Sequence, residues 1–283
     1  PADFTFGHRV TNRAIDFLER HRGDDFFLTV SYDEPHQPFL CPEPYASMYR
    51  DFVFPSSPNV TDTLEGKPTH QHAWAGEAKY RERGAIEIRR PDFFGCNSFV
   101  DSEIGRVLEA AERLAPDALV IYTSDHGDML ESHCLDGKGP VAYEEITHIP
   151  LIVSGPEQPS GTTSRGLVSH IDMVPTLLTH LGVDAPSMLE GVPLQPQLID
   201  PATTIHDTVF LEFGRYEIDH DGFGGFQPMR CAIDDSHKLV VNLLSEDELY
   251  HLDEDPQEMH NLIDHPDHAA VRVADRIVAG EVP

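Results

Sequence analysis

The chain has 283 residues, of which 40% are apolar and 24% charged, so it is long enough to bury the core of one large domain or of one domain with a small satellite. Its 20 basic and 49 acidic residues give a formal net charge of −29, which argues against binding to nucleic acid or to an anionic membrane surface. No run of about 18 apolar residues is present, so no membrane-spanning helix is expected.

The cysteines bear on disulfide and zinc content, and the first residue bears on whether the chain is part of a longer protein. Cys41, Cys96, Cys134 and Cys231 are widely spaced without a CxxC pair, so neither a zinc knuckle nor a dense disulfide framework is predicted. The chain starts at Pro1 with neither an initiator methionine nor a signal peptide, and we expect it to begin inside a longer protein. Localisation therefore stays open between cytoplasm and periplasm.

The first part of the chain predicts a helix followed by a strand. Apolar residues recur at helical spacing over residues 8–22, and the apolar run over residues 26–32 is typical of a buried strand. Residues 33–91 are rich in proline, histidine and charge, with no sustained period. We expect that stretch to be a long irregular excursion at the surface.

Regular structure returns with a helix over residues 93–114, whose apolar side chains share one face. Residues 118–123 and 149–155 are apolar on both faces, which is typical of central strands in a parallel sheet. Asp172 is expected to cap a further helix, and Gly182 to supply the left-handed residue at its end. Alternating helices and buried strands predict an α/β fold with a mostly parallel sheet.

After about residue 200 the pattern changes to short strands separated by turns rich in glycine and aspartate. The expected strands are residues 209–213, 229–233, 238–243 and 249–252. They predict a small antiparallel subdomain over residues 206–283, beside a core over residues 1–205.

Asp125 and His126 directly follow the expected strand over residues 118–123, at its carboxyl end, where ligands of open α/β sheets bind. A carboxylate beside an imidazole offers two donor atoms to one divalent cation, and Gly127 allows a sharp turn behind them. On these three residues alone, a turn capped by Asp125 with His126 in solvent is an equally good interpretation.

Residues 122–156 contain a Ser-Asp-His-Gly turn, a Gly-Lys pair ahead of a Tyr-Glu pair, and an apolar strand that leads into Ser-Gly-Pro. The motif residues are Ser124, Asp125, His126, Gly127, Gly137, Lys138, Tyr143 and Glu144. This segment closely resembles the corresponding region of sulfatases, which belong to the alkaline phosphatase superfamily.

Two further segments are similar to the same family. Residues 27–39 resemble its strand followed by a Pro-His-x-Pro-Phe loop, and residues 248–262 resemble its C-terminal signature. Together the three segments extend over nearly the whole chain. The resemblance implies an alkaline-phosphatase-like core with a mostly parallel sheet flanked by helices, plus a small C-terminal antiparallel α+β subdomain.

The resemblance also implies site residues. Asp125 and His126 would be metal ligands, whereas Lys138 and His36 would contact the sulfate and stabilise or protonate the leaving oxygen. Cleavage of a sulfate ester develops negative charge on that oxygen, so a cation, a lysine and a proton donor suit the chemistry. The expected activity is metal-dependent hydrolysis of a small-molecule or carbohydrate sulfate ester. Without the resemblance, a solvated Lys138 and a turn residue His36 would be the better interpretation.

The nucleophile motif of the family is missing from the chain. Sulfatases attack with a formylglycine made in a Cys-x-Pro-Ser-Arg motif, and neither the stretch Cys41-Pro42-Glu43-Pro44 nor Cys96 fits it. The family's N-terminal pair of acidic metal ligands is missing as well. We therefore expect the nucleophile and these ligands in an upstream segment of the same protein, without which this chain should be inactive.

His126 is a second departure, because many sulfatases place asparagine there. An imidazole favours manganese or zinc, whereas carboxylates favour calcium or magnesium. We expect one divalent metal ion, with calcium ahead of magnesium, manganese and zinc. The same histidine occurs in phosphonate monoester and phosphodiester hydrolases of the superfamily, which are the alternative function, and a non-catalytic truncated relic is the third.

Substrate contacts are expected from residues 33–91 and from the C-terminal subdomain, which in this family overhangs the pocket. The candidates are His70, His72, Trp74, Arg215 and His220. An exposed loop residue without a role is the alternative for each of them. Sugar, aryl and alkyl sulfates all remain open as substrates.

Overall fold

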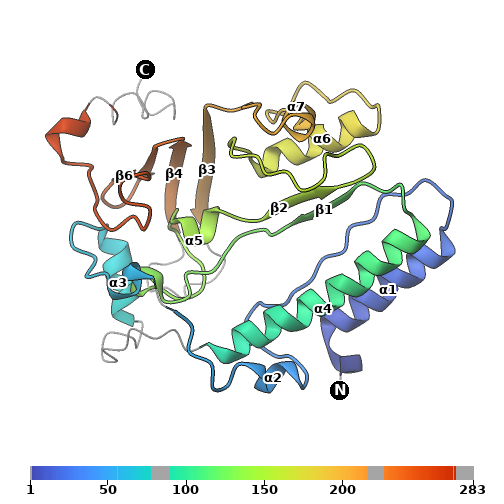
Figure 1. Ribbon diagram of the computed structural model, residues 1–283. Helices are drawn as coiled ribbons and strands as arrows, with labels where there is room; N and C mark the ends of the chain where they lie inside the picture. The colour runs from blue at the N-terminus through green and yellow to red at the C-terminus, as the bar shows by residue number, and fades with distance from the viewer. Residues whose placement is uncertain (1, 56, 78–89, 216–225, 270, 272–283) are drawn as a thin grey trace. The chain divides into compact units, whose positions relative to one another are not determined.

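The computed structural model describes residues 2–55, 57–77, 90–215, 226–269 and 271. The chain forms two compact units, one made of Pro1–Pro55 with Glu87–Val120 and the other of Ser56–Ile86 with Ile121–Pro283. Figure 1 labels their helices and strands. Within the described ranges, no helix is both long and apolar enough to cross a membrane.

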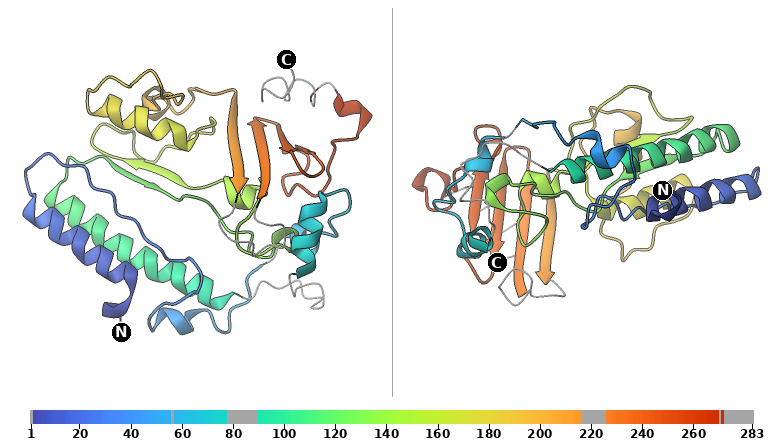
Figure 2. Two further views of the ribbon diagram at one scale, coloured as in Figure 1. Left: turned by 180° about the vertical axis from the view of Figure 1, so that it is seen from behind. Right: turned by 90° about the horizontal axis from the view of Figure 1, so that it is seen from below.

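The first unit is built on two helices, α1 (Phe6–Arg20) and α4 (Pro91–Leu114), which lie side by side in Figures 1 and 2. Thr5 caps α1 by accepting the His8 N–H, and α4 begins with a proline, whose missing N–H is harmless at a first helical position. The two helices confirm those expected at residues 8–22 and 93–114. The buried side chains of their shared core are Leu18, Ala110 and Leu114.

The strand expected at residues 26–32 is wrong. Those residues pair with no strand in the part of the chain that the structure describes. Phe26 and Leu28 pack against the core of α1 and α4, whereas Phe27 is 67% exposed. A strand requires a neighbouring strand that completes its backbone hydrogen bonds. Here Phe26 and Leu28 pack on the two helices, but the backbone pairs with no strand in the described part of the chain.

The expected irregular stretch over residues 33–91 holds only short helices where it is described. These are α2 (Tyr45–Met48) in the first unit, and the 3₁₀ turn η2 (Pro58–Thr61) and α3 (Thr69–Glu77) in the second. The stretch therefore contributes loops and short helices, of which α3 is the longest with nine residues, as its lack of period predicts.

β1 (Val120–Thr123) and β2 (Leu151–Ser154) form a two-stranded sheet, which confirms the strands expected around them. The expectation that both are buried on two faces is wrong for the described residues, because Tyr122 is 41% and Ile152 is 59% exposed. An apolar run predicts which residues avoid water, but burial also requires a second layer over the sheet. The described residues leave these side chains partly uncovered.

The helix after β2 has a different start from the one expected. Ser169 and Asp172 form a capping box around the 3₁₀ turn η4 (His170–Asp172), and α6 (Met173–His180) continues from it. Gly182 has φ +67°, and its N–H bonds back to the last turn of α6, as expected of a left-handed helix end. A short helix, α7 (Gln195–Ile199), follows.

A four-stranded antiparallel sheet completes the second unit in the order β3-β4-β5-β6, which confirms the expected C-terminal antiparallel strands. The strands are β3 (Thr208–Arg215), β4 (Phe226–Asp234), β5 (His237–Asn242) and β6 (Glu248–His251). The domain boundary near residue 205 stays a prediction.

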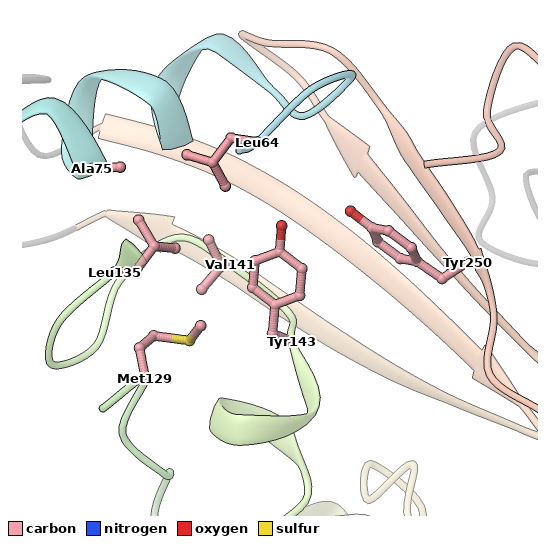
Figure 3. Close-up of a cluster of buried hydrophobic side chains, with 7 residues drawn as sticks. All are labelled: Leu64, Ala75, Met129, Leu135, Val141, Tyr143 and Tyr250. Atoms are coloured by element: carbon pink, nitrogen blue, oxygen red, sulfur yellow. The ribbon is translucent and has the colours of Figure 1, made fainter. Parts of the chain in front are cut away.

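One buried cluster joins this sheet to the loop that follows β1. Its residues, shown in Figure 3, are Leu64, Ala75, Met129, Leu135, Val141, Tyr143 and Tyr250. The rings of Tyr143 and Tyr250 lie 6.1 Å apart between centroids. Because Tyr250 belongs to β6 and Tyr143 to the loop, the cluster packs the loop against the C-terminal sheet.

Candidate active site

A turn of four residues, Ser124 to Gly127, leaves the end of β1. The Asp125 carboxylate accepts the backbone N–H of His126 at 3.0 Å, and the Ser124 hydroxyl donates to the His126 carbonyl at 2.8 Å. Asp125 Oδ2 lies 3.5 Å from His126 Nε2, and the two side chains are 85% and 34% exposed. The turn thus brings an oxygen and a nitrogen donor together at a solvent-accessible point.

The close approach of α5 (Glu144–Thr147) explains the glycine in this turn. A Cβ atom on Gly127 would lie 1.8 Å from the carbonyl oxygen of Glu145. The Gly127 N–H also donates to the carbonyl of Ile146 at 3.0 Å. The position of α5 therefore fixes the position of the turn.

Lys138 reaches the same turn from the following loop. Its Nζ lies 2.8 Å from His126 Nε2, and His126 Nδ1 lies 2.7 Å from the carbonyl of Gly127. A carbonyl only accepts, so Nδ1 carries the proton, and the Nε2 lone pair accepts from the Lys138 ammonium. A neutral imidazole, a carboxylate and an ammonium thus form one polar cluster.

Two of the expected substrate-contact residues lie against the Lys138 loop. The buried His70 has Nε2 3.0 Å from the carbonyl of Pro140. A Cβ atom on Gly139 would lie 2.4 Å from the indole ring of Trp74. In this structure both side chains support the loop, and a direct contact of either with substrate stays a prediction.

The remaining expected site residues lie elsewhere. His36 belongs to the first unit, where it is exposed in a loop, so its expected meeting with Lys138 at one anion stays a prediction. His72 is exposed on α3. Arg215 is the last residue of β3, with its side chain outside the description, and His220 lies outside the described residues.

A second Asp–His pair, which the sequence reasoning missed, is buried. His133 Nδ1 lies 2.6 Å from Asp62 Oδ2, and the imidazole stacks on the Tyr143 ring at 3.8 Å. Burial alone would raise the pKa of Asp62, but its bonds to His133 and to the Leu64 N–H, with Lys67 nearby, hold the pKa below its usual value. Because the His133 side chain is 0% exposed, this pair supports the core rather than meeting a substrate.

The chemistry of Asp125 and His126 fits part of a divalent-metal site. Their 3.5 Å donor separation is close to that of neighbouring ligands at bond lengths of roughly 2.0–2.4 Å. Over the described ranges, no group of three or more histidine, cysteine, aspartate or glutamate side chains is arranged to hold a metal ion. Asp125 and His126 would therefore supply only part of the ligand set of such an ion, and their role as metal ligands stays a prediction.

The chain matches two protein-family models. The Sulfatase model matches residues 3–183, and the model for the C-terminal part of N-sulphoglucosamine sulphohydrolase matches residues 137–277. The uncharacterized sulfatase YidJ of Escherichia coli (strain K12) is 43% identical over 275 residues, which are 95% of this chain and 53% of that protein. The chain spans about half the length of the curated relatives it matches.

Solved structures share the fold. BT4656, in complex with its substrate D-glucosamine-2-N,6-O-disulfate, has a TM-score of 0.82 at 21% identity, covering 97% of this chain and 68% of that one. The phosphonate monoester hydrolase SpPMH from Silicibacter pomeroyi has a TM-score of 0.82 at 23% identity, covering 99% and 60%. These neighbours confirm the alkaline-phosphatase-like fold class expected from the sequence.

Proposed function

Since the chain belongs to the sulfatase family, we propose that it forms the metal- and sulfate-binding part of an enzyme that hydrolyses sulfate esters. The observation that carries the proposal is the meeting of Asp125, His126 and Lys138 at one exposed point beyond β1. A carboxylate and an imidazole can bind a cation, and the ammonium beside them can bind an anion.

Each of these side chains has a distinct task. Asp125 and His126 would hold one divalent cation, which supplies Lewis-acid stabilisation of negative charge when bound. Lys138 binds a sulfate oxygen through its ammonium and stabilises the charge that develops as the S–O bond to the leaving group breaks. His36 is the proposed proton donor to the leaving oxygen.

The identity of the metal follows from its ligands. The carboxylate of Asp125, together with the acidic ligands proposed upstream, favours calcium, so calcium is the first candidate. The imidazole of His126 also suits manganese or zinc, and magnesium is the fourth candidate.

The nucleophile and the remaining acidic ligands belong, in this proposal, to an upstream segment of the same protein. The chain contains no Cys-x-Pro-Ser-Arg stretch, which is the motif that a formylglycine requires in the family. The matched relatives are about twice as long as the region they share with this chain. Activity would thus require both parts.

A carbohydrate sulfate ester is the proposed substrate class. The structural neighbour BT4656 was solved with a sulfated glucosamine as its substrate, and one matching family model is named after a sulphoglucosamine hydrolase. His72, Arg215 and His220 stay candidates for contacts to the sugar.

A phosphonate monoester or phosphodiester hydrolase is the second candidate. His126 favours it, because the imidazole stands where many sulfatases place an asparagine. The likeness in fold to SpPMH supports the same alternative. A truncated relic without activity is the third possibility, and assays separate the three.

The test uses the complete protein that contains this chain. Initial rates with 4-nitrophenyl sulfate and with 4-nitrophenyl phenylphosphonate are compared after chelation and after addition of calcium, magnesium, manganese or zinc. The proposal predicts metal-dependent turnover with the sulfate preferred, and its loss in Lys138→Ala but not in His180→Ala, an exposed control on α6. A preference for the phosphonate supports the alternative, and no turnover with any metal supports the relic.

A further inference from the structure

A group of buried charges in the second unit has no place in the proposed chemistry. The Lys238 side chain on β5 is 0% exposed, and its Nζ lies 3.0 Å from Glu144 Oε1 and 2.9 Å from Glu258 Oε1. The contact to Glu258 is an ion pair without the alignment of a hydrogen bond. Buried charges destabilise a fold unless they are well paired, so this arrangement calls for an explanation.

Glu258 reaches the start of α5 with its second carboxylate oxygen. Oε2 accepts the backbone N–H of Glu144 at 2.8 Å, which gives a partner to a group that has none within its own helix. Glu258 itself has φ +54°, a conformation that is uncommon for residues other than glycine. Its carbonyl accepts from the buried Lys67, so contacts on several sides hold the residue in that conformation.

The helix that Glu258 and Lys238 contact, α5, is the one that packs on the turn of residues 124–127. The Ile146 carbonyl on α5 accepts the Gly127 N–H at 3.0 Å, and the Glu145 carbonyl occupies the space that a side chain on Gly127 would need. A continuous set of contacts therefore runs from β5 through α5 to the residue next to His126.

We infer that Lys238 and Glu258 are positioning residues that hold α5 against Gly127 and thereby fix the direction of Asp125 and His126. The consequence for turnover rests on the proposed function, whereas the structural coupling does not. The same contacts link the C-terminal sheet to the candidate active site over sequence separations of 94 and 114 residues.

The experiment measures hydrogen exchange of the Gly127 amide by NMR in the complete protein. Lys238→Met and Glu258→Ala remove the ion pairs, and we expect exchange at Gly127 to become faster by roughly three- to tenfold, the effect of weakening one hydrogen bond. Glu258→Gln keeps an oxygen that can accept the Glu144 N–H, so it should restore part of the protection.

A matched control separates positioning from general stability. Leu239 is the next residue after Lys238 on β5, and successive side chains of a strand point to opposite faces of the sheet. Leu239 is buried with Val241 and Leu249 in a different cluster from its neighbour Val240. Leu239→Ala should therefore destabilise β5 without a selective change at Gly127. Equal acceleration at Gly127 in Leu239→Ala, or unchanged exchange in both Lys238→Met and Glu258→Ala, would overturn the inference.

Turnover of 4-nitrophenyl sulfate in the same variants keeps the two claims apart. If both hold, the wild-type protein is active, kcat falls in Lys238→Met and in Glu258→Ala, and it falls less in Glu258→Gln than in Glu258→Ala. If the wild-type protein lacks activity but Gly127 exchange responds as predicted, the positioning role stands and the proposed function fails.

Discussion

Lys138 Nζ lies 2.8 Å from His126 Nε2, so a lysine that is proposed to bind the anion contacts the lone pair that is proposed to bind the cation. An ammonium and a metal ion cannot share one lone pair. If His126 bound a cation through this lone pair, Lys138 would have to turn to another acceptor, and a sulfate oxygen at the same point would be such an acceptor. The contact therefore connects the two proposed roles, and each can be tested.

Lys138→Ala should lower kcat/KM for a sulfate ester by about 100-fold or more, because it removes one preorganised cationic donor. The folding stability should change little, since the side chain is only partly buried. Steady-state kinetics and a thermal melt of the same preparation check both expectations. A variant with unchanged kinetics would remove Lys138 from the mechanism.

His126→Asn should change which metal restores activity after chelation. An amide oxygen in place of the imidazole favours hard cations, so the ratio of calcium to manganese affinity should rise by about tenfold. Isothermal titration with each ion measures that ratio, and His148→Asn, at an exposed histidine of α5's C-terminal end, serves as the control. An unchanged ratio would mean that His126 is not a ligand.

Gly127→Ala should destabilise the protein by about 1–3 kcal/mol, because the new Cβ atom meets the Glu145 carbonyl and forces backbone to move. Activity should fall with it, since the displaced turn carries Asp125 and His126. The matched control is Gly105→Ala on α4, where a Cβ atom meets nothing within 4 Å and alanine is the better helix former. Chemical denaturation compares the two variants, and equal stability would contradict the account.

The pH dependence of stability should contain a contribution from Glu258. Burial raises the pKa of this carboxyl to about 7 although Lys238 and the Glu144 N–H oppose the shift. A raised folded-state pKa gives stability that is fully present below the unfolded value, near 4.5, and is lost as the pH rises through about 7.

Glu258→Gln removes this titration, so the loss of stability between pH 4.5 and 7 should shrink by an amount on the order of 1–3 kcal/mol. Besides Lys238, the charged groups that face Glu258 are Glu144 on α5 and Lys67 at its carbonyl, and all of them remain in the variant. Urea denaturation at several pH values measures the difference. Parallel curves for the wild type and the variant would show that Glu258 does not titrate in this range.

Helices and strands that follow from a local pattern of apolar residues were predicted best from the sequence. The helices α1 and α4 have one apolar face over several turns, and each C-terminal strand is a short apolar run between turns, so the structure confirms both. The run at residues 26–32 failed because the same apolar residues can pack on helices as well as pair in a sheet. Asp125 and His126 were candidates from their place directly after an expected strand, and the resemblance to a family strengthened that interpretation. Lys138 was reached only through the resemblance, since its contact with His126 depends on a loop that has no period.

Lys238 and Glu258 show what sequence patterns could not reveal. Both lie in stretches that were assigned correctly, one in an expected strand and one in the C-terminal signature, yet no role followed from either. Their partner Glu144 is 94 residues from Lys238 and 114 from Glu258. From sequence alone, a lysine in a strand is expected to be exposed to solvent. Only the tertiary structure shows that Lys238 is buried and lies between the carboxylates of Glu144 and Glu258.

The most direct test of the central claim is crystallographic. Crystals of the complete protein are grown with manganese, and anomalous differences are collected for the wild type and for the variant that combines Asp125→Ala with His126→Ala. The account predicts a strong peak within about 2.5 Å of both Asp125 and His126 in the wild type, and its loss in the variant. A well-ordered turn without a peak, or a peak that survives in the variant, would contradict the assignment of these residues as metal ligands.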